Sequence, residues 1–285
     1  MKVPDEIRKC VAFIGQRNQI DESFTYRGTC FFVGITYPDG FKTGYAVTAK
    51  HVIENISKTG SKEILTRYNL KNNKTVEVST KFTDWAHHPD PTVDIAINYF
   101  KGFKPEMDHM ALPISMFATD QVIKEEEIGI GEEVFITGLF KNHVGQAKNI
   151  PILRVGNIAG MPEEKVSAAL GPMEAYLIEA RSIGGLSGSP VFVNLGLIRN
   201  TTKAGVYMMT SHSPHYFLGL MHGHWDENSS KVDDIEKNET RQVNMGIGIV
   251  VPASKLLDFL NRPKIKAQRD KRHDEIAKNK RGQKK

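Results

Sequence analysis

Short apolar segments rich in β-branched and aromatic residues recur along this chain, separated by Gly and Pro turn signals. Helix signals are nearly absent until residues 252–260, where an apolar stripe precedes Pro263, which ends that helix. This texture predicts an all-β protein, built as two antiparallel barrels with a C-terminal helix. The expected strands are 8–14, 25–36, 44–49, 63–70, 74–82, 93–97, 132–140, 150–159, 174–181, 190–195, 204–211, 216–224 and 244–251.

The length of 285 residues, with 40% hydrophobic and 25% charged residues, fits a globular protein of one large domain or two lobes. An irregular connector with two prolines at residues 100–125 marks the lobe boundary. We therefore expect an N-terminal barrel over 1–120 and a C-terminal barrel with the terminal helix over 121–262.

The net charge of +5 belongs to the end of the chain. Residues 263–285 hold ten Lys/Arg against three Asp/Glu, so this segment carries +7 and the remainder carries −2. The segment has no aromatic residue and little periodicity, which predicts a disordered, solvated tail. The alternative is contact with nucleic acid or with an acidic partner.

The compartment is predicted from the cysteines and from the start of the chain. Cys10 and Cys30 are too few for a disulfide framework and lie in strand-like runs, as buried free thiols do. The first eight residues lack the apolar core of a signal peptide, and no run has the length of a membrane span. We expect a cytoplasmic protein without membrane contact.

One stretch has the composition of a nucleophile site: Gly184-Gly-Leu-Ser187-Gly-Ser-Pro190, between two apolar runs. Glycine lets the backbone turn so that successive N–H groups point at one spot, where they can hold a developing negative charge. The plainer interpretation is a tight turn between two strands. Whether other residues suited to act with Ser187 are present distinguishes a nucleophile site from a simple turn.

Two further residues are candidate partners. His51 follows the expected strand 44–49 and begins a short helix or turn. Asp94 heads the apolar run 93–97, where a carboxylate is unfavourable unless a donor satisfies it. A histidine N–H would satisfy it; the plainer interpretation of Asp94 is a cap or turn residue.

The order His51, Asp94, Ser187, with its local frames, resembles the chymotrypsin/trypsin-like serine peptidases. Val47-Thr-Ala-Lys-His51 is similar to the family's Thr-Ala-Ala-His, Asp94-Ile-Ala to its Asp-Ile-Ala, and Gly185-Leu-Ser187-Gly-Ser-Pro to its Gly-x-Ser-Gly-Gly-Pro. The resemblance covers most of residues 8–262. It is strongest to the bacterial Deg-type and glutamyl-endopeptidase-like branches, here without a PDZ domain.

This resemblance implies two six-stranded barrels of the trypsin-like fold and a Ser-His-Asp triad. Ser187 would be the nucleophile, His51 the general base and Asp94 the group that orients and stabilises the imidazole. The N–H groups of Gly185 and Ser187 would form the oxyanion hole. The substrate would be a polypeptide, and neither a cofactor nor a metal is required.

Departures from the family concern activation and specificity. Leu186 stands where digestive trypsins carry an aspartate, so we expect no trypsin-like zymogen cleavage. Control would then come from elsewhere, for example from a regulatory partner. By register, Arg181, His222 and His224 fall at the S1 pocket, which would favour an acidic P1 side chain. The plainer interpretation is an outward arginine and ordinary strand histidines.

Two other features leave alternatives open. A cluster of histidines is compatible with a zinc site, but no cysteine or well-placed carboxylate completes it, so we expect none. The polar, acidic segment 225–244 is either a solvated insertion or a loop that gates the substrate site. The histidines in question are His212, His215, His222 and His224.

Three functions compete. The leading one is an intracellular bacterial-type serine endopeptidase. The second is a catalytically silent barrel that acts as a binding module. The third makes the chain the protease effector of a multi-component stress or phage-defence system, because it is a protease with no sensor domain of its own.

Overall fold

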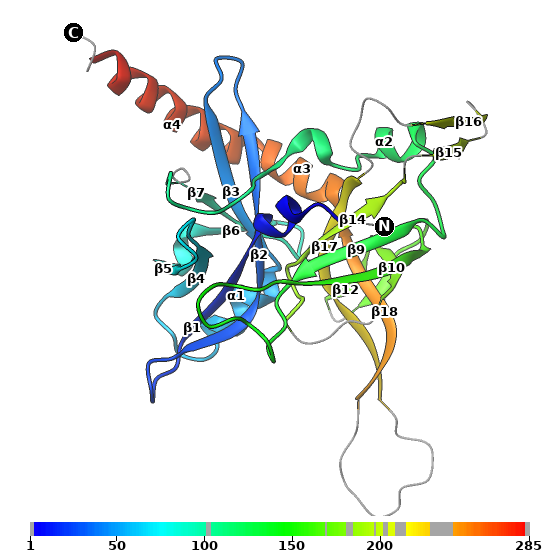
Figure 1. Cartoon of the computed structure of the whole chain (residues 1–285), viewed down its shortest axis with the longest axis horizontal. Helices are drawn as coiled ribbons and strands as arrows, with labels where there is room; N and C mark the ends of the chain where they lie inside the picture. Colours follow the sequence, from blue (N-terminus) through cyan, green and yellow to red (C-terminus); the bar gives the residue numbers. More distant parts are fainter. Residues whose placement is uncertain are drawn as a thin grey trace, which may run out of the picture.

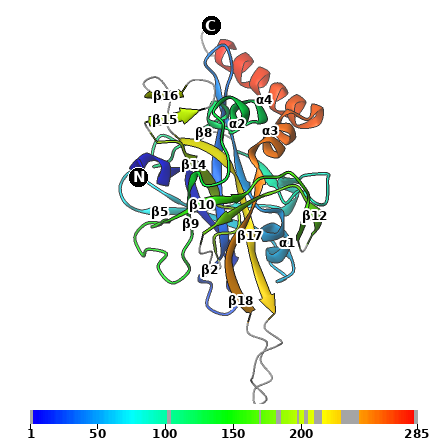
Figure 2. The ribbon, with the colours of Figure 1, turned by 90° about the vertical axis from the view of Figure 1, so that its right-hand side faces the viewer.

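The computed structural model describes residues 3–100, 104–168, 170–180, 185–196, 198–201, 205–208, 215–228 and 242–282. Strands dominate these residues and form two β-structures that lie side by side (Figures 1 and 2). The predicted all-β class is confirmed. Short helices connect and flank the strands: η1 (Asp5–Cys10), α1 (Lys50–Ser57), η2 (Phe82–Asp84), η3 (Ile114–Met116), α2 (Asp120–Glu125), α3 (Ala253–Asn261) and α4 (Pro263–Gly282).

The first β-structure is an eight-stranded sheet with the order β5-β4-β1-β2-β3-β7-β6, to which β8 adds as a parallel partner of β2. The predicted closed six-stranded barrel is therefore a half-barrel here. Its strands are β1 (Val11–Arg17), β2 (Phe24–Thr36), β3 (Lys42–Thr48), β4 (Ile64–Asn69), β5 (Thr75–Thr80), β6 (Trp85–His87), β7 (Ala96–Phe100) and β8 (Leu112–Pro113).

A turn between β5 and β6 explains why this sheet is not closed by pairing. β5 pairs with β4 and β6 pairs with β7, and η2 lies between the two strands. Asp84 accepts the Lys81 backbone N–H at 2.9 Å, and Trp85 Nε1 donates to Thr80 Oγ1 at 3.1 Å. These bonds stabilise a corner at which the chain passes from β5, at one edge of the sheet, to β6, at the other edge.

The second β-structure is a closed barrel with the order β10-β13-β18-β17-β14-β9, as predicted. β17 and β18 continue beyond the barrel as a two-stranded hairpin (Figure 1), so the strands reach into the segment expected to be a loop. The barrel strands are β9 (Glu133–Gly138), β10 (Ile152–Gly160), β13 (Tyr176–Glu179), β14 (Pro190–Asn194), β17 (His215–Asn228) and β18 (Gln242–Pro252). Two small hairpins flank them: β11 (Val166–Ala168) with β12 (Gly171–Met173), and β15 (Ile198–Thr201) with β16 (Gly205–Met208).

Aromatic side chains fill the seam between the two β-structures. The Phe217 ring of β17 lies 5.2 Å from the Phe31 ring of β2 and 4.8 Å from the Phe117 ring of the connector. The Ala118 N–H donates to the Phe217 carbonyl at 2.9 Å, so the connector joins the second barrel at this point. All three rings are fully buried, and their burial fixes how the two halves meet.

The C-terminal segment differs from the predicted disordered tail. Pro263 ends α3, but it also begins α4, where its fixed φ and missing N–H suit the first turn. The α4 helix docks on the first sheet: the Tyr37 hydroxyl donates to Asp270 at 2.7 Å, the His273 ring stacks on Tyr37 at 4.2 Å, and the Arg272 guanidinium lies 4.1 Å from the centre of the Tyr99 ring. These partners lie on β7 and in the turn between β2 and β3, so the composition of the tail does not reveal them.

Both cysteines are free and fully buried, as expected from the sequence. Burial raises the pKa of the Cys30 thiol to about 12, and it raises that of Cys10 as well. Thiols held in the neutral form are poor nucleophiles, so neither residue competes with Ser187 for a catalytic role.

Candidate active site

His51 lies at the start of α1, directly after β3. No side chain of the preceding residue caps this helix; instead, Asp94 Oδ1 accepts the His51 backbone N–H at 2.9 Å. Asp94 Oδ2 lies 2.6 Å from His51 Nδ1. A helix N-terminus leaves backbone N–H groups unpaired and favours a negative charge, so one carboxylate both caps α1 and holds the imidazole.

Asp94 lies in the loop that precedes β7, and its side chain has no exposed surface. Neighbouring bonds hold this loop in place: the Val93 N–H donates to the Asp90 carbonyl at 3.1 Å, and the His88 N–H donates to the Ile95 carbonyl at 2.9 Å. Burial by itself opposes ionisation, but hydrogen bonds from His222 and His51 outweigh it and hold the pKa of Asp94 below its usual range. The carboxylate is therefore charged at neutral pH.

Ser187 lies on a tight loop between β13 and β14. Gly185 and Gly188 have φ angles of +110° and +81°, which favour glycine, and the Ser189 N–H closes a turn on the Leu186 carbonyl at 2.9 Å. The Gly188 N–H donates to the Met221 carbonyl at 2.8 Å. Within the described residues, no hydrogen-bond acceptor is found for the backbone N–H of Gly185 or Ser187. Both groups are thus available to a ligand.

Backbone contacts bring the Ser187 loop against the segment that carries His51. A Cβ added to Gly188 would lie 2.4 Å from Thr48 Oγ1 and 3.1 Å from the Ala49 nitrogen. Among the described residues, no hydrogen bond joins Ser187 Oγ to His51, and the serine side chain is half-buried. Catalytic hydrogen bonds are often long in unliganded structures and tighten when substrate binds.

Thr29 on β2 is a site residue that our sequence reasoning did not find. Its N–H donates to the Ser187 carbonyl at 3.0 Å, and its hydroxyl donates to the Gly185 carbonyl at 3.0 Å. The same hydroxyl oxygen accepts the Leu139 N–H at 2.9 Å. A threonine in a β-rich run carries no special signal, because strands are generally rich in threonine.

His222, which sequence reasoning assigned to the S1 pocket, makes a contact with Asp94 that the sequence did not predict. A β-bulge sets it apart on β17: Met221 pairs with Val250 and Gly223 pairs with Ile249, so His222 is the extra residue. Its Nδ1 lies 2.5 Å from Asp94 Oδ2, and its ring centre lies 5.4 Å from that of His51.

The assignment of Arg181, His222 and His224 to the S1 pocket stays a prediction. Arg181 lies outside the described residues, as does His212 of the histidine cluster. His224 is half-buried on β17, and His215 packs its ring against Phe135 at 5.3 Å. Leu186, at the position of the trypsin aspartate, is fully buried in the second barrel and has no charge to offer an N-terminal amine.

The three side chains of His51, Asp94 and His222 are also the kind of group that can hold a metal ion, with ligand atoms within 4.8 Å of one another. Their contacts of 2.6 and 2.5 Å are hydrogen-bond distances. Zinc bonds of about 2.0–2.2 Å in a tetrahedral site would hold neighbouring ligand atoms roughly 3.3 Å apart. The arrangement therefore fits two protons shared with one carboxylate better than a bound ion.

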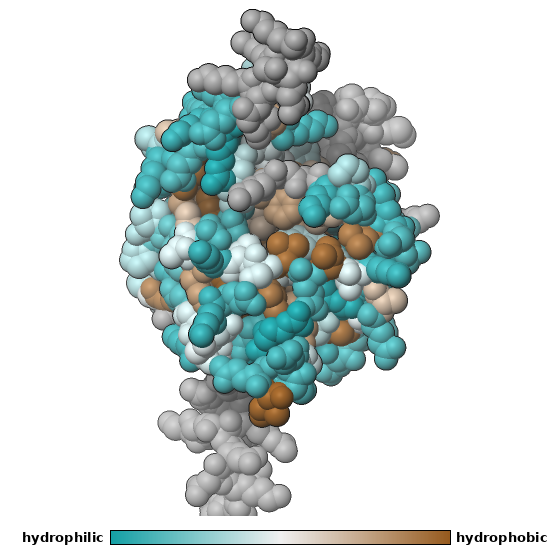
Figure 3. Space-filling model, turned by 90° about the vertical axis from the view of Figure 1, so that its left-hand side faces the viewer, coloured by the Kyte–Doolittle hydropathy of each residue, from teal (hydrophilic) through white to brown (hydrophobic). Residues whose placement is uncertain are grey.

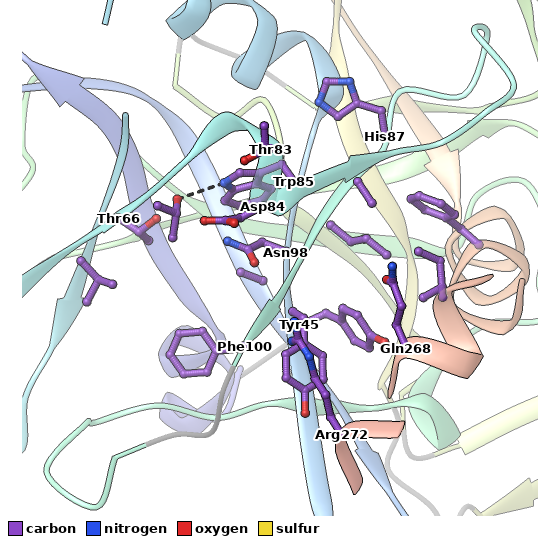
Figure 4. Close-up of a pocket in the computed structure, with 18 of the residues that line it drawn as sticks. Tyr45, Thr66, Thr83, Asp84, Trp85, His87, Asn98, Phe100, Gln268 and Arg272 are labelled. Atoms are coloured by element: carbon purple, nitrogen blue, oxygen red, sulfur yellow. Dashed lines mark hydrogen bonds between the residues drawn. The ribbon is translucent and has the colours of Figure 1, made fainter. Parts of the chain in front are cut away.

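A cavity of about 1460 Å³ lies in the first sheet, between its splayed edge strands and helices α3 and α4. Tyr45, Trp85, Phe100 and Arg272 line it (Figure 4), and hydrophobic side chains gather near the middle of this otherwise hydrophilic side of the molecule (Figure 3). None of the residues that line the cavity is His51, Asp94 or Ser187. The hydrogen-bonded histidines and the serine loop, not this cavity, form the candidate active site.

Comparisons with solved structures agree with this architecture. The chain superposes on the MamO protease domain from Magnetospirillum magneticum with a TM-score of 0.52 and 12% identity, over 90% of this chain and 98% of that one. On Deg5 the TM-score is 0.51 with 13% identity, over 90% of this chain and 91% of that one.

The fold is that of the trypsin-like serine proteases. The predicted resemblance to the Deg-type branch is thereby confirmed at the level of structure. No family model matches the sequence, and no curated protein matches it either. At 12% and 13% identity, the trypsin-like fold is what the likeness establishes, and the chemistry has to be argued from the site. No helix among the described residues is both long and apolar enough to cross a membrane.

Proposed function

We propose that this chain is a serine endopeptidase that cleaves peptide bonds through an acyl-enzyme. The observation that carries the proposal is that the fully buried Asp94 bonds His51 at two points, while the nearby serine loop has two N–H groups with no acceptor among the described residues. A carboxylate-oriented histidine and a pair of such donors are parts that serine nucleophilic catalysis uses.

The chemistry follows from the hydrogen bonds. The ionised Asp94 accepts from His51 Nδ1, so Nε2 is the nitrogen left to take the proton of Ser187 Oγ. Oγ then attacks the scissile carbonyl. The Asp94 charge stabilises the imidazolium, which next protonates the leaving amine. The oxyanion formed in each half-reaction is held by the N–H groups of Gly185 and Ser187.

The test is covalent labelling by a fluorophosphonate probe together with cleavage of casein. We expect wild type to be labelled at Ser187, and Ser187→Ala to lose labelling and about 10⁴- to 10⁶-fold in cleavage rate. Ser167→Ala, at an exposed serine on β11, is the matched control and should behave as wild type. Cleavage by Ser187→Ala at the wild-type rate would refute the assignment.

The second candidate is a silent barrel that binds polypeptide without cleaving it. It is favoured by the missing hydrogen bond between Ser187 and His51 in the described residues. A wild-type chain that binds peptides but resists the probe at every pH would select this function.

Substrate preference, partners and location are further parts of the proposal. An acidic P1 preference rests on Arg181, His222 and His224, and a P1-scanning peptide library tests it: preference for Lys, Arg or bulky apolar residues would overturn it.

Lys264, Lys266 and Lys271 are exposed on α4 and could contact nucleic acid or an acidic regulatory partner. Salt-dependent DNA binding that disappears on truncation after Arg262 would support contact with nucleic acid.

A cytoplasmic location is supported by the two free thiols and is tested by cell fractionation.

A further inference from the structure

We propose that His222 is a positioning residue that shares the triad carboxylate with His51 and holds this carboxylate toward the general base. The inference rests on the proposed peptidase function. Its basis is one oxygen atom: Asp94 Oδ2 lies 2.6 Å from His51 Nδ1 and 2.5 Å from His222 Nδ1.

The tautomers follow from the charge of Asp94. An ionised carboxylate has no proton to donate, so each nitrogen that bonds it must carry a hydrogen. Both imidazoles are therefore protonated on Nδ1, and in the neutral form both have their lone pair on Nε2. His222 thus adds a third hydrogen bond to the two that His51 makes, and it restrains Asp94 with its Oδ2 toward His51.

The backbone around His222 is fixed to the nucleophile loop. The bulge on β17 turns the residue out of the strand pairing, toward Asp94. On its N-terminal side, Met221 donates its N–H to the Ser189 carbonyl at 2.8 Å and accepts the Gly188 N–H at 2.8 Å. His222 consequently links the loop of Ser187 in one barrel with the carboxylate of the other.

The two imidazoles lie next to each other on the same carboxylate. Their ring centres are 5.4 Å apart, with the rings nearly perpendicular, and the side chain of His222 is 11% exposed. His222 is thus a mostly buried donor whose geometry is set by the same oxygen that holds His51.

The experiment tests the donor with two variants. His222→Asn keeps an N–H donor, whereas His222→Leu removes it. His143→Asn, at an exposed loop histidine, is the control. The measurements are kcat/KM for a peptide substrate and the rate of fluorophosphonate labelling.

We expect His222→Leu to lose about 10- to 100-fold in both rates, as expected for one hydrogen bond to a charged acceptor. His222→Asn should recover most of this loss, because its amide can donate to the same oxygen. If wild type is active and His222→Leu reacts at the wild-type rate, the proposal is wrong.

A spectroscopic readout keeps the test independent of activity. In Ser187→Ala protein with labelled histidine, we expect two strongly downfield Nδ1–H resonances. His222→Asn should remove one and shift the other, and His143→Asn should change neither. A single such resonance, assigned to His51, would overturn the shared carboxylate even in an inactive chain. Failure of wild type to react with the probe, with both resonances present, would instead refute the peptidase function alone.

Discussion

The backbone N–H of Thr29 donates to the carbonyl of Ser187 at 3.0 Å, so a strand of the first sheet holds the nucleophile loop of the second barrel. The Thr29 carbonyl accepts the Thr48 hydroxyl at 2.7 Å, three residues before His51 in the chain. One buried residue thereby sets the position of the serine loop relative to the segment that carries the histidine. Catalysis by groups on two lobes needs this kind of fixed geometry, because small displacements of reacting atoms lower the rate steeply.

Thr29→Val tests this role. Valine has a similar shape and retains the backbone bond, but it leaves the Gly185 carbonyl and the Leu139 N–H without their buried partner. We expect a loss of about 2–4 kcal/mol in the free energy of unfolding. Probe labelling should slow by about 10- to 100-fold, less than removal of an oxyanion donor itself. Thr29→Ser restores the hydroxyl and should recover most of the stability and most of the labelling rate. Equal labelling of wild type, Thr29→Val and Thr29→Ser would contradict the role.

Gly188→Ala should be among the most destabilising single changes in this chain. A Cβ at Gly188 would lie 2.3 Å from the Thr29 carbonyl oxygen and 2.4 Å from Thr48 Oγ1. Gly40 has the same φ of +81° but nothing within 4 Å of its Cβ position, so Gly40→Ala isolates the backbone strain. We expect about 1–2 kcal/mol for Gly40→Ala and more than about 3 kcal/mol for Gly188→Ala. Urea unfolding measures the loss of stability in both variants. Similar values would show that the residues around Gly188 rearrange around the added methyl group with little loss of stability.

The lowered pKa of Asp94 predicts how stability depends on pH. A carboxyl group whose folded pKa lies below its unfolded value of about 3.9 stabilises the fold above that pH, and this contribution is lost as the pH falls toward the folded pKa. Asp94→Asn should therefore be less stable than wild type at pH 7, with the difference shrinking below about pH 4. Thermal unfolding at pH 7 and pH 3 measures this, and a difference that grows on acidification would contradict it. The same variant should also lose about 10⁴-fold in kcat.

Truncation after Arg262 tests whether α4 belongs to the folded unit. It removes the Tyr37–Asp270 hydrogen bond, the ring stack of His273 and the buried Arg269, whose guanidinium donates to the Leu260 carbonyl at 2.9 Å. We expect a Tm lower by about 5–10 °C and unchanged probe labelling, since among the described residues no hydrogen bond or ring contact joins α4 to His51, Asp94 or Ser187. Tyr37→Phe, which removes the hydroxyl that bonds Asp270, should cost about 1 kcal/mol. An unchanged Tm on truncation would mean that the helix adds nothing to stability.

Much of this protein can be derived from its sequence. Alternating apolar residues and Gly/Pro turns are local properties, and they suffice for the β class, for most strands and for the terminal helix. The order of His51, Asp94 and Ser187, each in its own short motif, predicts a shared site; in the structure Asp94 bonds His51, and the Ser187 loop contacts the segment that precedes His51. Pro263 is the instructive exception within local reasoning, because proline ends one helix and suits the first turn of the next.

The tertiary structure decided the contacts between residues that are distant in the chain. The bulge that turns His222 to Asp94 depends on how β17 pairs with β18, and a shift of one residue in pairing changes where a side chain points. Thr29 gains its role from a loop more than 150 residues away, and α4 folds onto aromatic rings of the first sheet. The local sequence pattern determines which helices and strands form. Which side chains bond the same partner depends on packing between these elements, and no short window of sequence contains that information.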